Sequence, residues 1–346
     1  MKRKKACPAA DAAKSTGRPS AAVPCISYRR VLQGLLGLSM LAVMGCQGDL
    51  SPAMPLVTSI QRSEWAFGDV PGSLLATDHY RIRTTSGNRA MLTHLPAFME
   101  AAYSQYLSLT GLVDRPGGRP MPIYLLASRP QWAAMTRSVT GDQSATYLAI
   151  ENGGYCYRGV CVLWDMRNFA TFSIAAHEGL HQLLYHRLRE HVPAWAEEGL
   201  CVQAEGFAMS ATTVRLDPRL NTLRMANLRK VLSAGRWLAL AKLLASDAAD
   251  HIKAFPMRAP EYYGQLWALV MFIRSDPNYR AGLERMIADA QAGKFRKALG
   301  VPPIMGRGRS YNRAVSVPAF RHYIEADLAT FEKRFKAYAK KLAKLS

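Results

Sequence analysis

The residues best suited to chemistry are two histidines and a glutamate near the middle of the chain. His177, Glu178 and His181 form a His-Glu-x-x-His pattern in a segment of helical period that begins near Thr171. On a helix, residues four apart lie one turn apart, so both imidazoles can reach one metal ion. Glu178 then lies beside the open coordination position, where a general base is needed. The spacing predicts a Zn²⁺ site that activates water for hydrolysis.

A catalytic zinc needs a third protein ligand, and the next helical segment supplies two adjacent carboxylates. These belong to Glu197 and Glu198, which follow a short turn at residues 191–193. The metzincin pattern, with a third histidine further along the first helix, is excluded because Leu184 and Arg187 occupy its glycine and histidine positions. We therefore expect a glutamate of the second helix to complete the ligand set.

The motif and the Trp-x-x-Glu-Gly-Leu sequence at residues 195–200 resemble the gluzincin metallopeptidases, notably the peptidase-MA-like domains of bacterial envelope proteins. The resemblance extends roughly over residues 80–345. It implies a zincin-like fold, hydrolysis of peptide bonds, and Glu198 rather than Glu197 as the third zinc ligand, because the ligand immediately precedes Gly-Leu. Relatives commonly have alanine where this chain has Cys201.

Further residues are candidates for roles around the metal. Glu205, seven residues after the expected ligand, is placed to orient a zinc ligand, and the alternative is an exposed helix carboxylate. By resemblance to the aminopeptidase branch, Tyr263 is expected to donate its hydroxyl to the oxyanion, with Tyr262 as a competing donor. Residues 150–152 lack the glycine and methionine of the element with which aminopeptidases hold a free N-terminus, so endopeptidase activity is favoured.

The order of the expected elements predicts an α+β fold. Strands and helices mix up to about residue 190, whereas later segments have almost entirely helical period. We therefore expect one peptidase domain at 76–346, with a mixed α/β N-terminal lobe at about 76–190 and a helical C-terminal lobe at about 191–346. The expected strands lie at residues 80–85, 121–127, 147–150 and 155–164.

The N-terminal region has the features of a bacterial export signal. An apolar run at residues 31–44, preceded by two arginines, suits the core of a signal peptide but is short for a membrane-spanning helix. Cys46 follows this run and resembles the lipidated cysteine of bacterial lipoproteins, and the glutamine after it favours the outer membrane. We expect a signal peptide at 1–45, a tether at 46–75, and a lipid-anchored domain in the periplasm or at the cell surface.

The remaining cysteines and the net charge bear on redox state and partners. Cys156 and Cys161 flank a four-residue hairpin loop and are expected to form a disulfide in an oxidising compartment. Cys201, inside an apolar helix, is expected to be a buried small hydrophobe. The net charge of +20 becomes +13 without residues 1–45, which carry eight basic residues and one acidic residue. This charge favours anionic partners, although nucleic acid is not expected outside the cytoplasm.

These features together predict an exported zinc metallopeptidase that is anchored to the membrane by lipid and acts on a peptide or protein substrate. The alternative is a catalytically inactive envelope lipoprotein that keeps the zincin fold as a binding or structural module. Zinc content and peptide hydrolysis distinguish the two.

Overall fold

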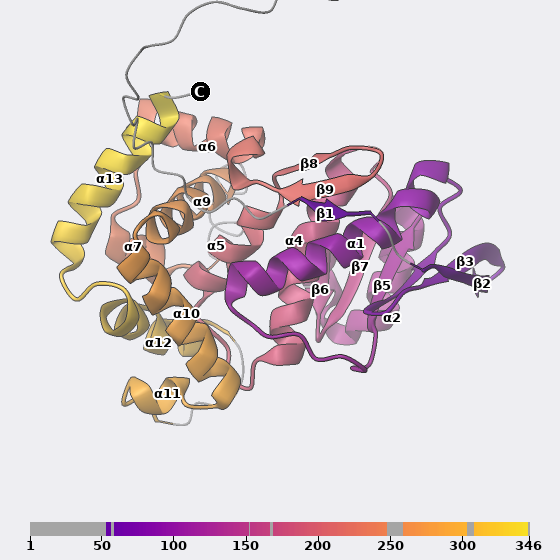
Figure 1. Cartoon of the computed structure of the whole chain (residues 1–346), viewed down its shortest axis with the longest axis horizontal. Helices are drawn as coiled ribbons and strands as arrows, with labels where there is room; N and C mark the ends of the chain where they lie inside the picture. Colours follow the sequence, from indigo (N-terminus) through magenta and orange to yellow (C-terminus); the bar gives the residue numbers. More distant parts are fainter. Residues whose placement is uncertain are drawn as a thin grey trace, which may run out of the picture. The chain divides into compact units, whose positions relative to one another are not determined.

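The computed structural model describes residues 53–56, 59–151, 153–166, 169–247, 259–302 and 308–344. A sheet-rich N-terminal part and a helical C-terminal part make this an α+β fold, which confirms the predicted class (Figure 1). The expected signal peptide and Cys46 lie outside the described residues. Among the helices that are described, none combines the length and the apolar character needed to cross a membrane.

The N-terminal part is built on a six-stranded sheet with the order β2-β3-β4-β5-β7-β6. Its central strands β4, β5 and β7 run parallel, and the outer pairs are antiparallel. Strand β6 therefore forms one edge of the sheet, beside the strand that precedes the motif helix. The strands are β2 (Gln61–Phe67), β3 (Val70–Ala76), β4 (Tyr80–Thr84), β5 (Met121–Leu126), β6 (Gly154–Tyr157) and β7 (Val160–Trp164).

Alternating residues of the central strands send side chains to opposite faces of this sheet. Ile123 of β5 joins the main core together with residues of α1 (Arg89–Thr110) and α4 (Phe169–Arg187). Its neighbour Tyr124 packs on a smaller cluster that includes residues of α2 (Arg129–Thr140). Because the side chains of a strand alternate with a period of two, helices cover both faces, and α4 lies on the face of the main core.

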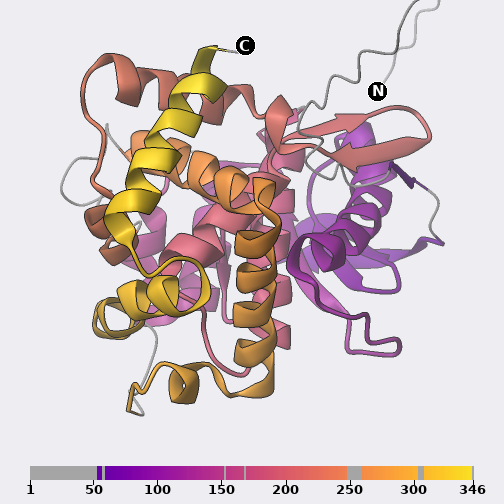
Figure 2. The same ribbon diagram turned by 60° about the vertical axis from the view of Figure 1, so that its left-hand side comes forward.

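The C-terminal part is a group of helices around the fully buried Trp195 and Trp267. Helix α13 packs against α6, α7 and α9 (Figure 2). A small sheet with the order β1-β9-β8 contacts α1. The elements not yet given are β1 (Met54–Pro55), α5 (Ala194–Ala204), β8 (Phe207–Met209), β9 (Thr213–Leu216), α6 (Thr222–Ser233), α7 (Leu240–Ala245), α9 (Ala259–Ser275), α10 (Pro277–Ala292), α11 (Phe295–Ala298), α12 (Arg309–Tyr323) and α13 (Leu328–Lys344).

Two glycines bring α4 and α5 into close contact with neighbouring helices. A Cβ atom at Gly179 of α4 would lie 2.6 Å from Met99 Cε and 2.8 Å from the Tyr106 hydroxyl, both on α1. A Cβ atom at Gly199 of α5 would lie 2.4 Å from Val270 Cγ2 of α9. Such distances are shorter than carbon–carbon contacts at optimal separation, so both approaches depend on glycine.

Two predictions for the N-terminal part are wrong in detail. Strands β2 and β3 belong to the main sheet, so the range 46–75, expected to be a tether, overlaps the folded domain. Strand β2 is an edge strand with mostly exposed residues and therefore shows no apolar alternation in the sequence. The strand expected at 147–150 is replaced by a short helix, α3 (Ser144–Leu148), whose Tyr147 packs against Tyr155 with ring centroids 4.5 Å apart.

Candidate active site

The two motif histidines converge on one point between α4 and α5. His177 Nε2 and His181 Nε2 lie 3.2 Å apart, as expected for residues one helical turn apart. Both side chains are largely buried, with 11% and 15% of the side chain exposed. The ring nitrogens on the far side, the two Nδ1 atoms, contact separate carboxylates, so each ring is oriented through its Nδ1.

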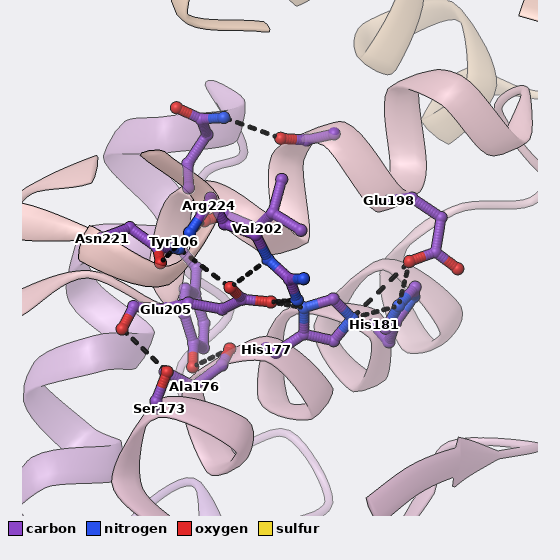
Figure 3. Close-up of polar contacts among 12 residues, drawn as sticks. Tyr106, Ser173, Ala176, His177, His181, Glu198, Val202, Glu205, Asn221 and Arg224 are labelled. Atoms are coloured by element: carbon purple, nitrogen blue, oxygen red, sulfur yellow. Dashed lines mark hydrogen bonds and ion pairs between the residues drawn. The ribbon is translucent and has the colours of Figure 1, made fainter. Parts of the chain in front are cut away.

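The carboxylate of Glu198 completes this cluster from α5. Its Oε2 lies 3.6 Å from the Nε2 atoms of both His177 and His181 (Figure 3). This oxygen is buried and has no hydrogen-bond partner among the described residues. Zinc–ligand bonds of about 2.0–2.2 Å in a tetrahedral arrangement separate neighbouring N and O ligands by roughly 3.3–3.6 Å. The three atoms therefore fit the ligands of one Zn²⁺.

The neighbouring Glu197 points to a different atom. Its Oε1 lies 3.0 Å from His181 Nδ1, the nitrogen that faces away from the cluster. A carboxylate at this position fixes the tautomer that leaves Nε2 free to bind metal. The geometry therefore favours Glu198 as ligand and gives Glu197, considered in the sequence only as a rival ligand, the task of orienting His181.

Glu205 performs the same task for the other histidine. Its Oε1 lies 2.9 Å from His177 Nδ1, and the carboxylate also accepts hydrogen bonds from Arg224 and Asn221. Figure 3 shows these residues on the side of His177 opposite to Glu198. Burial alone would raise the pKa of Glu205, but the Arg224 charge and His177 outweigh it and lower the pKa to about 2. The predicted orienting role of Glu205 is therefore supported by its contacts.

In the absence of metal, the cluster favours protonated imidazole. Burial alone would lower the pKa of His177, but the neighbouring carboxylates of Glu198 and Glu205 outweigh burial and raise the pKa to about 9. The pKa of His181 is also raised, since Cys201, Glu198 and Glu197 together outweigh its burial. Glu198 lies between both rings, and its pKa is lowered despite burial because of their charges. A divalent cation needs neutral imidazoles and an ionised carboxylate, so its binding here would displace the protons of His177 and His181.

Glu178 lies next to His177 on α4 and is only 9% exposed. Burial raises the pKa of its carboxyl group, and the positive charges of His177 and His181 oppose that effect. A carboxylate with a raised pKa is a better proton acceptor near neutral pH. Its main chain is held as well, since the Cys161 thiol donates a hydrogen bond to the Glu178 carbonyl at 3.2 Å.

The structure separates the two candidate tyrosines. The ring of Tyr263 lies 6.4 Å from that of His177, and the Arg224 guanidinium lies 4.8 Å from the centre of the Tyr263 ring. Burial raises the pKa of Tyr263 well above its usual value, so the hydroxyl stays protonated. Tyr262 is 1% exposed and its hydroxyl donates to the Ser246 carbonyl at 3.3 Å. Tyr263 is therefore the tyrosine placed at the site.

Cys201 is a second candidate for the third ligand. Three atoms lie within 4.8 Å of one another: the Cys201 sulfur, one ring nitrogen of His177 and one ring nitrogen of His181. Burial raises the pKa of the thiol to about 12, with His181 opposing that effect. We favour Glu198 because its oxygen is ionised, lies 3.6 Å from both Nε2 atoms and lacks a hydrogen-bond partner among the described residues. Cys201 follows Glu198 by one helical turn, and this spacing indicates that its thiol lies near the same point. From the sequence we expected only a buried hydrophobic residue.

The disulfide predicted between Cys156 and Cys161 is absent from the structure, where both thiols are free. The residues are direct partners across the β6–β7 hairpin, which closes through the two-residue turn Arg158-Gly159 rather than a four-residue loop. Both turn residues have positive φ angles, 49° and 76°, as in the type I′ turns that join tightly paired strands. The Cys161 thiol donates a hydrogen bond to the Glu178 carbonyl.

Arg224 and Asn221 are residues of the candidate site that sequence reasoning missed. They come from the start of α6, and no local pattern connects them with a histidine more than forty residues earlier. Only the fold brings them to Glu205.

A comparison with known families matches part of this chain. Residues 170–288 are similar to a family described as a protein of unknown function, DUF1570. The matched segment runs from α4 into α10 and includes both motif histidines, Glu198, Glu205 and Tyr263. No curated protein has a sequence significantly similar to this chain.

Proposed function

We propose that this chain is a zinc-dependent metallopeptidase of gluzincin type that hydrolyses peptide bonds in a peptide or protein substrate. One observation carries the proposal: the buried Glu198 Oε2 lies 3.6 Å from both histidine Nε2 atoms and has no hydrogen-bond partner in the described part of the chain. A structural pair of histidines would not need an unsatisfied carboxylate oxygen at their meeting point, since leaving it unpaired costs free energy.

The surrounding residues support amide hydrolysis. A zinc ion held here would lower the pKa of a bound water and polarise a carbonyl group. Glu178 accepts a proton from the attacking water and delivers it to the leaving amine. The protonated hydroxyl of Tyr263 donates to the oxygen on which negative charge develops. Arg224 positions both the Tyr263 ring and, through Glu205, the His177 ring.

The edge strand β6 suggests how a substrate would bind. It pairs with β7 on one side and packs against α4, the helix that bears the motif. An extended peptide that adds to the open edge of β6 gains main-chain hydrogen bonds without specific side-chain recognition. This mode suits internal peptide segments, so we favour endopeptidase activity.

The decisive experiment compares purified full-length parent protein with Glu178→Gln. We expect one zinc per chain in both proteins, and cleavage of a peptide library by the parent alone, because the amide keeps the size of the side chain and removes the base. Glu64→Gln is the matched control, since it makes the same change at an exposed residue of β2, outside the motif helix. Zinc without hydrolysis in the parent would favour the inactive binding module, and absence of zinc would refute the metal site.

We also propose that the domain acts outside the cytoplasm and is held to the membrane by a lipidated Cys46. This proposal rests on the sequence pattern at residues 31–46. Cys46→Ser should move the protein from the membrane to the soluble fraction, because no acyl chains would be attached. Unchanged fractionation would rule out this anchor.

A further inference from the structure

A cavity lies beside the motif helix, away from the candidate metal site. It has a volume of about 280 Å³ and is lined by residues of α4, α1, the loop after α1 and the start of β5. Leu183 and Arg187 line it from α4, and at 100° per residue they face away from the side that carries His181. The cavity is therefore separate from the candidate metal site. Its polar lining consists of His79, Tyr103, Arg115, Arg119, His186 and Arg187.

Arg187 is a buried cation that makes no ion pair within the described ranges, although its charge helps to lower the pKa of nearby Asp114. It is 8% exposed, and its guanidinium donates to the Val113 carbonyl and to the Tyr103 hydroxyl. Its Nε is buried and has no hydrogen-bond partner among the described residues, and no carboxylate of that part lies within ion-pair distance. A buried charge without an ion-pair partner costs free energy, so an anion in the cavity would stabilise the Arg187 guanidinium.

Two further guanidinium groups reach the cavity from the loop after α1. Arg115 and Arg119 are exposed residues of this loop and line the cavity. Within the described ranges, neither makes an ion pair. A bound anion would therefore meet three guanidinium groups, two from a loop and one from a helix.

The nearest carboxylates are engaged with other groups. Asp114 Oδ1 accepts a hydrogen bond from the Tyr103 hydroxyl at 2.7 Å and lies 3.6 Å from His79 Nε2. Glu100 Oε2 lies 2.6 Å from His79 Nδ1. Burial alone would lower the pKa of His79, but Glu100 and Asp114 outweigh it and raise the pKa. The two carboxylates thus share His79, and the three arginines keep an excess of positive charge.

We propose that this cavity binds the phosphoryl group of a phosphate ester. Guanidinium groups bind phosphate oxygens through paired, charge-assisted hydrogen bonds. A phosphoryl group presents acceptor oxygens in several directions and so suits donors that arrive from different elements, whereas the two oxygens of a carboxylate lie in one plane. The ester is either a soluble small molecule or the headgroup of an anionic lipid, and both sources offer the same chemistry.

The first experiment titrates inorganic phosphate into the full-length protein by calorimetry, with sodium chloride at matched ionic strength as the reference. We expect saturable binding that weakens at least roughly tenfold in Arg119→Gln and is lost in Arg187→Gln, because each variant removes a charge-assisted donor. Arg313→Gln, on the exposed side of α12, is the charge-matched control and should bind like the parent.

Arg119 is exposed, so Arg119→Gln remains informative if Arg187→Gln does not fold. Phosphate that bound at the His177 cluster instead would be insensitive to Arg119→Gln. The proposal is overturned if the parent shows no saturable binding, or if Arg119→Gln and Arg313→Gln bind phosphate equally.

The second experiment identifies the source of the phosphate. Vesicles of phosphatidylglycerol and of phosphatidylcholine are compared for binding of the parent, Arg119→Gln and Arg313→Gln. If the parent and Arg313→Gln prefer phosphatidylglycerol vesicles and Arg119→Gln does not, the ligand is a lipid headgroup. If phosphate binding depends on Arg119 but the protein does not prefer phosphatidylglycerol vesicles, the ligand is a soluble phosphate ester.

Discussion

Removal of Glu205 tests how the candidate metal site is held together. The carboxylate contacts His177 Nδ1 at 2.9 Å, and it accepts hydrogen bonds from Arg224 Nη2 at 2.6 Å and Nε at 2.8 Å. Glu205→Ala therefore frees the ring of a zinc ligand and also leaves the Arg224 guanidinium, whose side chain is 13% exposed, without its carboxylate.

We expect Glu205→Ala to lower both the zinc affinity and the stability of the fold, by amounts that can be estimated separately. Loss of the group that orients a ligand histidine weakens metal binding by about 10–100-fold. Loss of one partner from a buried ion pair lowers the free energy of unfolding by about 3–5 kcal/mol. Glu197→Ala is the matched variant, because it removes the 3.0 Å contact to His181 Nδ1 from a side chain that is 19% exposed, against 7% for Glu205. We expect a similar loss of affinity but a smaller loss of stability.

Zinc affinity is measured by competition with a chelator of known affinity, and stability by urea unfolding of the metal-free proteins. A zinc affinity of Glu205→Ala within about twofold of the parent would show that Glu205 does not orient His177. Equal destabilisation by Glu197→Ala and Glu205→Ala would contradict the role given to the Glu205–Arg224 ion pair.

Three further results are expected. The pKa of His177 is raised from 6.5 to about 9, so its protonation stabilises the metal-free fold fully below pH 6.5, and this contribution is lost as the pH rises through 9. Because zinc binds neutral imidazole, zinc affinity should rise over the same interval, and a flat profile in chelator competition would contradict the assigned ligand. Tyr263→Phe should lower turnover by about a hundredfold with zinc content intact, whereas Tyr262→Phe should turn over like the parent; the opposite order in a peptide-cleavage assay would exchange their roles. Glu198→Ala should lose zinc and Cys201→Ser should keep it, and the reverse in metal analysis would make the thiol the third ligand.

The sequence predicts the parts of the site that depend on local spacing. His177, Glu178 and His181 lie on one helix, so their relative positions follow from its period, and the structure brings the two Nε2 atoms within 3.2 Å. The α+β class also follows from local periodicity. The choice of Glu198 as third ligand required the resemblance to gluzincins, because nothing in the spacing distinguishes it from Glu197.

Contacts between distant segments were beyond such reasoning. Arg224 meets Glu205 only because α6 packs beside the end of α5, and the sequence shows no pattern that would indicate this. The strand β2 was missed because it is a polar edge strand that buries little apolar surface. Tertiary packing therefore determines the groups that orient the ligands, whereas helical period determines the pattern of the motif itself.

Gly179 and Gly199 fix the two helices of the candidate site before any metal is bound. Each lies one or two residues from an expected zinc ligand, and each rests against a neighbouring helix that leaves no space for a Cβ atom. The backbones of α4 and α5 are thus closely packed against neighbouring helices, and closely packed interiors deform little. When an ion enters such a preorganised site, little of its binding free energy is spent on ordering the ligands. Zinc fingers differ, because they fold only on binding zinc. Zinc should therefore be removable and replaceable in the folded protein, with exchange limited by release of the ion.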